Sequence, residues 1–232
     1  QRLALGEKGS GVDVLVMTAT PIPRSLALSQ YGEMDLTVLS EKPAGRKPVK
    51  TVMISDNRVK EIIFKLKEAI DSNIQAYWVC PLIEESEILD YTAAEERFKS
   101  LRADLGEGKV GLVHGQLSPE DKDEVMRKFS QGEIKVLVST TVIEVGVDVP
   151  SASVIVIERA EKFGLAQLHQ LRGRVGRGSS ESSCILLYKA PLSENGERRL
   201  SLLRKTEDGF KIAELDLQMR GAGDIIGTAQ SG

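Results

Sequence analysis

Short apolar runs alternate with helical patterns from Lys50 to Tyr188, and this alternation limits the fold more than any other feature. The runs are short and several of them are rich in β-branched residues, which is typical of buried strands. Strands are predicted at Thr51–Ile54, Gln75–Cys80, Lys109–Val113, Ile134–Ser139, Ser153–Ile157 and Ser183–Tyr188. Strands that alternate with helices predict an α/β fold, with a mainly parallel sheet covered by helices on both faces.

Helices are predicted between several of these strands. They cover residues 57–71, 91–104, a segment that starts at Pro119, and residues 164–174. The third has the clearest beginning, because Ser118 is a suitable N-cap, Pro119 suits the first helical position and Asp121 follows three residues after the cap.

The two ends of the chain differ from this middle part. Residues 1–40 contain another β-branched run, Val12–Met17, and residues 41–49 carry the prolines and glycine of a linker. The main domain is predicted over residues 50–190. Residues 191–232 are predicted to form two helices, near 193–206 and 209–219, followed by a glycine-rich loop.

Composition argues against several classes of protein. Hydrophobic residues make up 41% and charged residues 28% of the 232, as in ordinary globular proteins. No apolar run approaches the ~18 residues that span a bilayer, and no signal core is present. The missing initiator Met leads us to expect a fragment of a longer chain. The two Cys and two His show no zinc-type spacing, so we predict no metal site. Both cysteines are predicted to be buried, reduced thiols, and reduced thiols fit a cytoplasmic protein.

Charge is distributed unevenly along the chain. The net charge is −3, but Arg159 to Lys205 holds seven Arg and three Lys against four Glu, a local charge of +6, and leaves −9 on the remainder. A basic stretch in an acidic chain indicates either a localised phosphate-binding face or a solvated helix surface.

The most informative segment is "QLHQLRGRVGRG", residues 167–178. It carries three arginines and three glycines in alternation, at Arg172, Gly173, Arg174, Gly176, Arg177 and Gly178. The planar guanidinium is suited to phosphate, and glycine lets a backbone approach closely. The alternative is an exposed helix end rich in arginine.

Two other segments place polar residues where strands are predicted to end. In "VLVSTTVIEVGVDVP", residues 136–150, a strand leads into Ser139, Thr140 and Thr141, whose hydroxyls and amides could bind phosphate or could cap a helix. In residues 110–129, a strand leads into His114 and Gln116. A lone histidine is more often structural than catalytic.

These segments together resemble the motifs of superfamily 2 helicases. "TATP" at residues 18–21 resembles motif III, "STTVIEVGVDVP" resembles motif V and "QLHQLRGRVGRG" resembles motif VI. The resemblance implies that residues 1–40 end a first RecA-like domain, residues 41–49 are a linker, and residues 50–190 form the second RecA-like motor domain, whose parallel sheet is of the P-loop NTPase type.

Finer features resemble the RecG family over essentially the whole chain. They include "AYWVCPLIEES", "VGLVHGQLS", "GLAQLHQLRGRVGRG" and "LLYKAPLS". The tail, residues 191–232, resembles the helical hairpin and loop of the translocation motif that RecG shares with the transcription–repair coupling factor. The chain departs from the family pattern at Ala222 and Ala229.

The resemblance implies a nucleotide site shared between two domains. ATP would bind with Mg²⁺, whose ligands belong to the first domain, as does the phosphate loop; neither motif occurs in this sequence. The catalytic positions implied are Gln170, Arg174 and Arg177, the last two as arginine fingers. The further nucleotide-binding positions implied are Gly146, Asp148 and Arg172.

The resemblance also implies DNA-binding and coupling residues. Those near the DNA strand are His114, Gln116, Thr140 and Thr141. Those that couple the domains or the hairpin are Thr18, Thr20, Arg199, Arg220 and Gln230.

The function implied is that of half of an ATP-dependent double-stranded DNA translocase. The whole protein would remodel stalled forks and Holliday junctions in recombination and repair, in the bacterial cytoplasm at the nucleoid. Its partners would be branched DNA and the missing wedge and first motor domains of the same chain. Two alternatives stay open: a transcription–repair coupling translocase, and a binding fragment without turnover. The isolated chain is expected to be inactive.

Overall fold

The computed structural model describes residues 45–82, 87–140, 149–178 and 180–220, together with Met17, Thr37 and Leu39. For residues 87–90 and 220 it describes the backbone alone. The strand predicted at Val12–Met17 and the glycine-rich loop after the second tail helix therefore lie outside the described residues.

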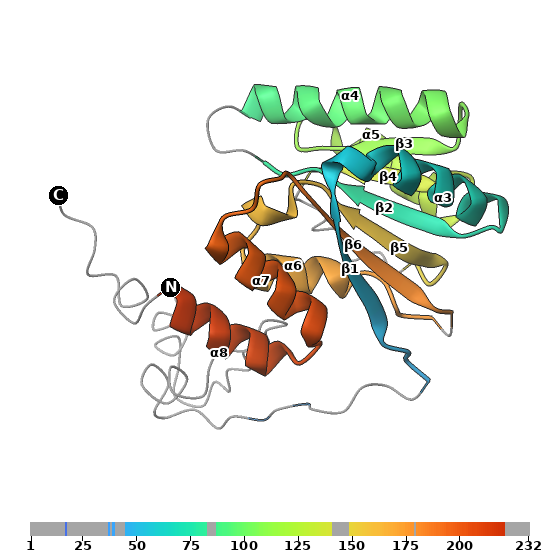
Figure 1. Cartoon of the computed structure of the whole chain (residues 1–232). Helices are drawn as coiled ribbons and strands as arrows, with labels where there is room; N and C mark the ends of the chain where they lie inside the picture. The colour runs from blue at the N-terminus through green and yellow to red at the C-terminus, as the bar shows by residue number, and fades with distance from the viewer. Residues whose placement is uncertain are drawn as a thin grey trace, which may run out of the picture.

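A six-stranded parallel sheet forms the centre of the molecule (Figure 1). Its strands are β1 (Val49–Ser55), β2 (Gln75–Val79), β3 (Val110–Val113), β4 (Val136–Ser139), β5 (Ala152–Ile157) and β6 (Ser182–Tyr188). Their order across the sheet is β1-β6-β5-β2-β4-β3, and every pairing is parallel. All six predicted strands are confirmed, as is the parallel α/β class.

The helices lie between the strands and after the last of them. They are η1 (Asp56–Arg58), α3 (Val59–Asp71), α4 (Glu87–Leu105), α5 (Pro119–Ser130), η2 (Ala160–Lys162), α6 (Leu165–Arg172), α7 (Glu194–Lys205) and α8 (Gly209–Arg220). The predicted cap of α5 is confirmed, because the Ser118 hydroxyl accepts a hydrogen bond from the Asp121 amide at 3.1 Å. Helix α4 begins earlier than the predicted residue 91.

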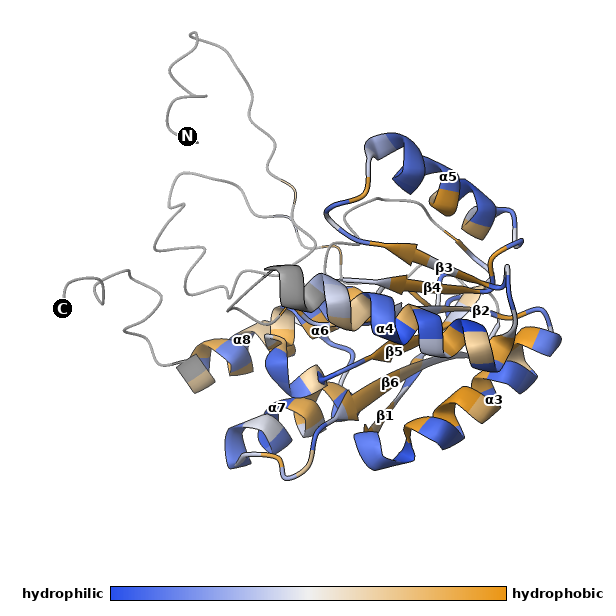
Figure 2. Cartoon of the chain, turned by 90° about the horizontal axis from the view of Figure 1, so that it is seen from above, coloured by the Kyte–Doolittle hydropathy of each residue, from blue (hydrophilic) through white to orange (hydrophobic). Residues whose placement is uncertain are grey.

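One face of the sheet is covered by α3 and α4. The apolar stripe of α3, with Ile62, Leu66 and Ile70, packs on Ala76 and Trp78 of β2 and on neighbouring strands. Because side chains alternate along a strand, the next residues of β2 face the other way. The strands therefore bury apolar side chains on both faces. Figure 2 shows the strands coloured mainly as hydrophobic.

The opposite face is covered by α5, α6 and the two tail helices. Its core contains Tyr77 of β2, Phe129 of α5 and Leu168 of α6. Leu203 of α7 and Ile212 of α8 belong to the same cluster and are at most 1% exposed. The tail helices therefore share the hydrophobic core of the strands.

Both cysteines are buried and free, Cys184 within β6 and Cys80 directly after β2. Burial raises the pKa of the Cys184 thiol to about 12. Among the described residues, no group of three or more His, Cys, Asp or Glu side chains could hold a metal ion. The described helices include none with the length and apolar character of a membrane span.

Candidate nucleotide- and DNA-binding site

Polar residues gather where β3 and β4 end, at one edge of the sheet. Val113 and Ser139 are the last residues of these strands and lie side by side in the register. The next residues, His114 and Thr140, therefore occupy the same edge, and the Thr140 amide donates to the Val113 carbonyl at 3.4 Å. Parallel α/β sheets place ligands at this edge. The fold thus brings together two of the residues predicted to bind DNA.

His114 is buried, with 9% of its surface exposed. Its ring lies 5.1 Å from that of Tyr91, centroid to centroid, and its Nδ1 has no hydrogen-bond partner among the described residues. Burial is the main cause that lowers the pKa of His114, and the positive charge of Lys122 adds to it against the opposing effect of Glu95. The imidazole is therefore mainly neutral at pH 7.

The turn after His114 is open to solvent. Gln116 is exposed in it, and Lys122 donates from Nζ to the Gly115 carbonyl at 3.2 Å. Thr140 is 1% exposed, and the neighbouring Ser139 Oγ is buried without a hydrogen-bond partner in the described part of the chain. The predicted residues Thr141, Gly146 and Asp148 lie outside the described residues.

Helix α6 presents the arginine-rich loop that follows it. Leu165, Leu168 and Leu171 bury one side of the helix, which leaves Gln170 exposed on the other. In the loop, residues 173–178, the Arg174 side chain is half-buried and the Arg177 side chain is exposed. The Arg177 Nε donates to the Gly173 carbonyl at 3.2 Å. Two guanidiniums on one glycine-rich loop, three residues apart in the sequence, suit a polyphosphate.

Arg172 lies differently, inside the protein and 3% exposed. Its Nη1 donates to the carbonyls of Leu203 at 2.6 Å and Thr206 at 2.9 Å, at the end of α7. Its Nη2 lies 3.0 Å from His169 Nδ1, which must accept because a guanidinium only donates. The last carbonyls of a helix have no hydrogen-bond donors within that helix, and the Arg172 guanidinium is the donor for these two. Its predicted nucleotide contact therefore has no support among these contacts.

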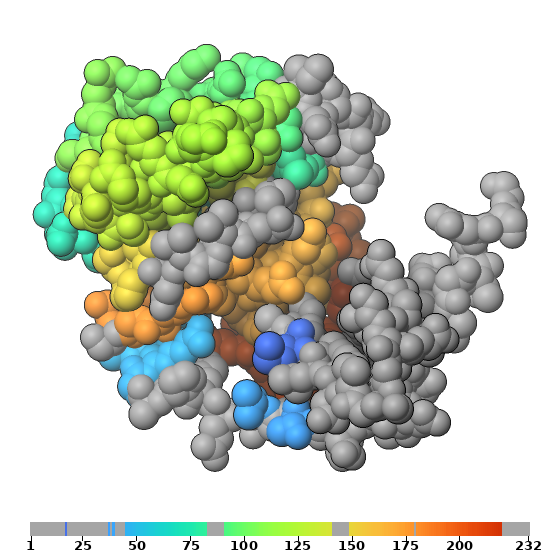
Figure 3. All heavy atoms as spheres, turned by 180° about the vertical axis from the view of Figure 1, so that it is seen from behind, coloured from blue at the N-terminus to red at the C-terminus, as the bar shows by residue number. Residues whose placement is uncertain are grey.

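The arginine loop also contacts the residues that enter β1. Gly176 has φ +76°, and a Cβ at this position would come within 2.7 Å of Val49 Cγ2. Arg46 donates from Nε to the Gly176 carbonyl at 3.0 Å. Figure 3 shows the start of β1, in light blue, directly beside the orange segment that includes this loop. Only glycine suits such a conformation at such close approach.

Arg199 joins α7 to η2. Its Nη2 donates to the Glu161 carbonyl at 2.8 Å, while its Nε is buried and has no hydrogen-bond partner among the residues that the structure describes. The Glu161 carboxylate accepts from Arg159 Nε at 2.9 Å and from the Lys189 amide at 3.3 Å. Arg159 itself has a left-handed backbone, with φ 52°. Of the other predicted coupling residues, Thr18, Thr20 and Gln230 lie outside the described residues, as does the side chain of Arg220.

A second cluster at this edge was missed by the sequence analysis. The Glu158 carboxylate, directly after β5, accepts from Trp78 Nε1 at 2.8 Å and from Arg97 of α4 at 2.7 and 2.9 Å. The Arg97 guanidinium also lies over the Trp78 ring, 5.2 Å from its centroid. Burial lowers the pKa of Arg97, but its hydrogen bond to Glu158 and the Glu158 charge raise it overall.

Residues 58–179 match the family model described as the helicase conserved C-terminal domain, and this stretch covers more than half of the chain. The chain belongs to this helicase family. Residues 206–232 also match the model for domain 3, C-terminal, of the ATP-dependent DNA helicase RecG. The predicted resemblance to RecG and the RecA-like fold are thus confirmed.

Similarity to RecG extends over the whole chain. The RecG helicases of Escherichia coli K12 and Acidithiobacillus ferridurans are 55% and 53% identical to it over 100% of this chain. A solved structure of RecG bound to a three-way DNA junction is 49% identical and matches 94% of this chain with a TM-score of 0.79. The helicase Lhr of Mycobacterium smegmatis, 17% identical with a TM-score of 0.57, shares the fold alone.

The chain spans only part of these relatives. It covers 34% of the length of each of the two RecG proteins and 28% of the chain in the solved RecG structure.

Proposed function

We propose that this chain is the second motor domain, with its attached helical hairpin, of an ATP-driven DNA helicase that acts on branched DNA. The observation that carries the proposal is the position of the arginine loop. Arg172, directly before it, is bound to the end of α7, while half-buried Arg174 and exposed Arg177 belong to the loop itself. A phosphate-binding loop joined to a helical hairpin is the arrangement that a nucleotide-driven translocase needs.

In the nucleotide site, Arg174 and Arg177 act as arginine fingers. They stabilise the negative charge that develops as the γ-phosphoryl group transfers, an effect of about 10³-fold or more in related systems. Gln170, exposed beside them, helps to hold motif VI against the nucleotide or the first domain. Gly146 and Asp148 approach the ribose. Mg²⁺ neutralises phosphate charge when bound, and its ligands belong to the first motor domain.

On the DNA side, His114, Gln116 and Thr140 at this edge, and Thr141 next to them in the sequence, bind the sugar–phosphate backbone. Exposed Gln116 contacts the DNA backbone directly, and the buried, neutral His114 supports the turn that carries Gln116. Arg199 and Arg220 in the hairpin, with Gln230 beyond it and Thr18 and Thr20 in motif III, couple nucleotide-driven closure to movement along the duplex.

The whole protein remodels stalled forks and Holliday junctions in recombination and repair. The similarity to RecG over the whole chain, and to a RecG bound to a three-way junction, supports this substrate class over that of a transcription–repair coupling factor. The relatives are bacterial, which supports a place in the bacterial cytoplasm with the DNA. The wedge and first motor domain are partners within the same longer chain.

The test is Arg177→Ala in the full-length protein. Because Arg177 contacts phosphate rather than DNA in this proposal, junction-stimulated ATP hydrolysis should fall by about 10³-fold while the Kd for a four-way junction changes little. Arg198→Ala, which removes an exposed arginine from α7, is the control and should leave both values unchanged. Normal turnover in Arg177→Ala would refute the finger assignment.

A further inference from the structure

Three segments that are distant in the sequence meet where β1 begins. They are residues 45–49 of the linker, the arginine loop at residues 173–178, and the turn at residues 206–208 between α7 and α8. The Val49 amide donates to the Glu207 carboxylate, and Val49 Cγ2 packs against Gly176. Together with the hydrogen bond from Arg46 to the Gly176 carbonyl, these contacts fasten the linker to both other segments.

Arg172 connects the remaining pair. Its guanidinium binds the Thr206 carbonyl, next to Glu207, so the base of the arginine loop is fastened to the turn. The Glu207 charge interacts favourably with this guanidinium and partly offsets the lowering of its pKa by burial. Half-buried Glu207 thus faces a backbone N–H of β1 and the charge of Arg172 at the same time. Charge-assisted contacts of this kind are stronger than neutral ones.

We propose that Glu207 is a positioning residue that makes the linker, the arginine loop and the hairpin move as one unit. The inference rests on the proposed motor function. When the two motor domains close on a nucleotide, the linker between them changes direction, and the Glu207 contact passes this change on to the hairpin. Without Glu207, the arginines would still reach the nucleotide, but the linker would be connected to the hairpin only indirectly, through the arginine loop and Arg172, and the hairpin would follow the linker less closely.

A purely structural role predicts a different result. If Glu207 only stabilised the fold, its loss would lower every activity in parallel with thermal stability. If Glu207 couples the segments, its loss lowers DNA movement more than ATP hydrolysis. The discriminating quantity is therefore the number of ATP molecules hydrolysed per base pair unwound.

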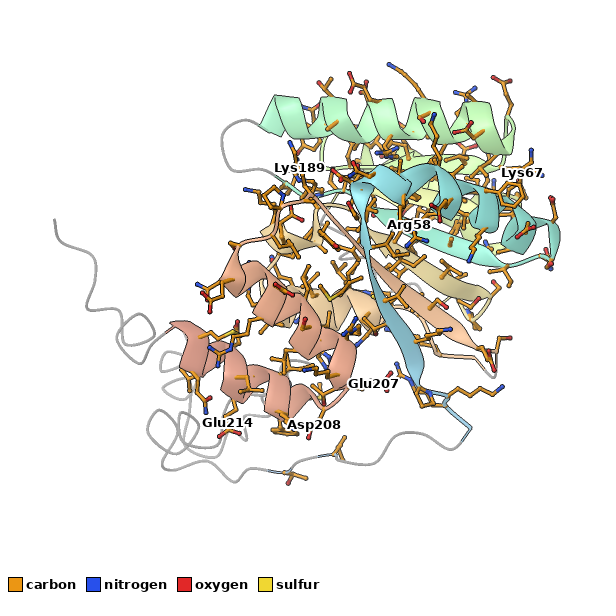
Figure 4. The ribbon with its side chains drawn as sticks, viewed as in Figure 1. Arg58, Lys67, Lys189, Glu207, Asp208 and Glu214 are labelled. Carbon is orange, nitrogen blue, oxygen red and sulfur yellow. The ribbon has the colours of Figure 1, made fainter. Side chains whose placement is uncertain are left out.

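The experiment compares Glu207→Ala, Glu207→Gln and Glu214→Ala in the full-length protein. Glu214 has the same charge on the same hairpin, is exposed, and lies on α8 away from β1, whereas Glu207 lies beside the start of β1 (Figure 4). Hydrolysis and junction unwinding are measured in one solution with a synthetic four-way junction. The melting temperature of each variant is measured as well.

In Glu207→Ala we expect unwinding to fall about tenfold while hydrolysis falls by less than about threefold, a separation within the usual range of coupling between sites. Glu207→Gln should recover part of the unwinding, because its amide oxygen still accepts from the Val49 N–H. Glu214→Ala should behave as the wild type.

An unchanged ratio of ATP to base pairs in Glu207→Ala would overturn the proposal, as would a parallel loss of both activities with melting temperature. A wild-type protein without junction-stimulated hydrolysis would instead refute the proposed function. The two failures are therefore distinguishable.

Discussion

The guanidinium of Arg97 donates two hydrogen bonds to the carboxylate of Glu158, and the two side chains are 22% and 21% exposed. Replacing Arg97 with Ala would leave a partly buried carboxylate without its cation and remove the cover of the Trp78 ring. We expect a loss of about 2 kcal/mol in the free energy of unfolding, below the usual ~3–5 kcal/mol because solvent reaches the pair. Urea unfolding, followed by Trp78 fluorescence, measures it.

The matched control is Arg102→Ala. Arg102 lies on the same helix and pairs with Glu107 at 2.7 Å, but Glu107 is 87% exposed. We expect a change below about 0.5 kcal/mol, since exposed ion pairs contribute little. Equal losses in the two variants would mean that the Glu158 cluster is not a special source of stability.

Gly176 gives a second prediction, because its backbone and its surroundings both require glycine. Gly176→Ala combines φ +76° with an approach of 2.7 Å to Val49 Cγ2. The loop would have to shift, and with it Arg174 and Arg177. We expect a loss of about 2–3 kcal/mol in the free energy of unfolding and a clear fall in ATP hydrolysis by the full-length protein.

Gly108→Ala separates the effect of the positive φ from the effect of the close contact. Gly108 has φ +80°, but a Cβ added there would meet nothing within 4 Å, so only the backbone strain applies. This variant should lose about 1 kcal/mol and retain full hydrolysis. If Gly176→Ala and Gly108→Ala lose equal stability and equal ATP hydrolysis, the close contact between the arginine loop and β1 is not important for activity.

His114 should titrate below the usual range. Its pKa is lowered in the folded protein, mainly by burial. A lowered histidine pKa means that protonation favours the unfolded state, so the stability due to His114 is complete above about pH 6.5 and is lost as the pH falls through the folded pKa. The chain has two histidines, so an NMR titration of the ring signals is simple to interpret.

The ring signal of His114 is the one that disappears from the spectrum of the His114→Gln variant. The pKa read from the midpoint of its titration should lie below ~6.5, the value for a histidine in an unfolded peptide. A midpoint above that value would show that the ring is more strongly paired with an acidic group such as Glu95 than the structure indicates.

The isolated chain of 232 residues gives the simplest prediction. We expect no ATP hydrolysis, with or without a four-way junction, because its arginines would have no opposing phosphate loop. Adding the first motor domain should restore turnover. Turnover stimulated by the junction in the isolated chain would mean that it contains a complete nucleotide site, and the assignment of Arg174 and Arg177 to half a site would be wrong.

Local pattern was enough to predict most of the fold. Each strand is a short, mainly apolar run, and Ser118 and Pro119 indicate the α5 cap, because these features act over a few residues. Helix α4 was predicted too short, since its first turn has little sequence periodicity of its own. The order of strands in the sheet was not predicted, because it depends on contacts between distant segments.

The site was predicted only in part for the same reason. Motif VI signals its arginines through composition, but nothing near Arg172 in the sequence indicates that its partners are the carbonyls of Leu203 and Thr206. Likewise, Glu158 and Arg97 are separated by 61 residues and carry no motif, so only the folded chain reveals the pair.

The packing of α7 and α8 into the core beneath the sheet has a consequence for how such proteins can be divided. Leu200 and Leu203 of α7 and Ile212 of α8 fill the same apolar layer as the strands. A cut after β6, where the composition changes, would leave that layer open to water and promote aggregation. The hairpin is therefore not an accessory that can be exchanged between motors, and any chimera must carry its tail and its sheet from the same parent.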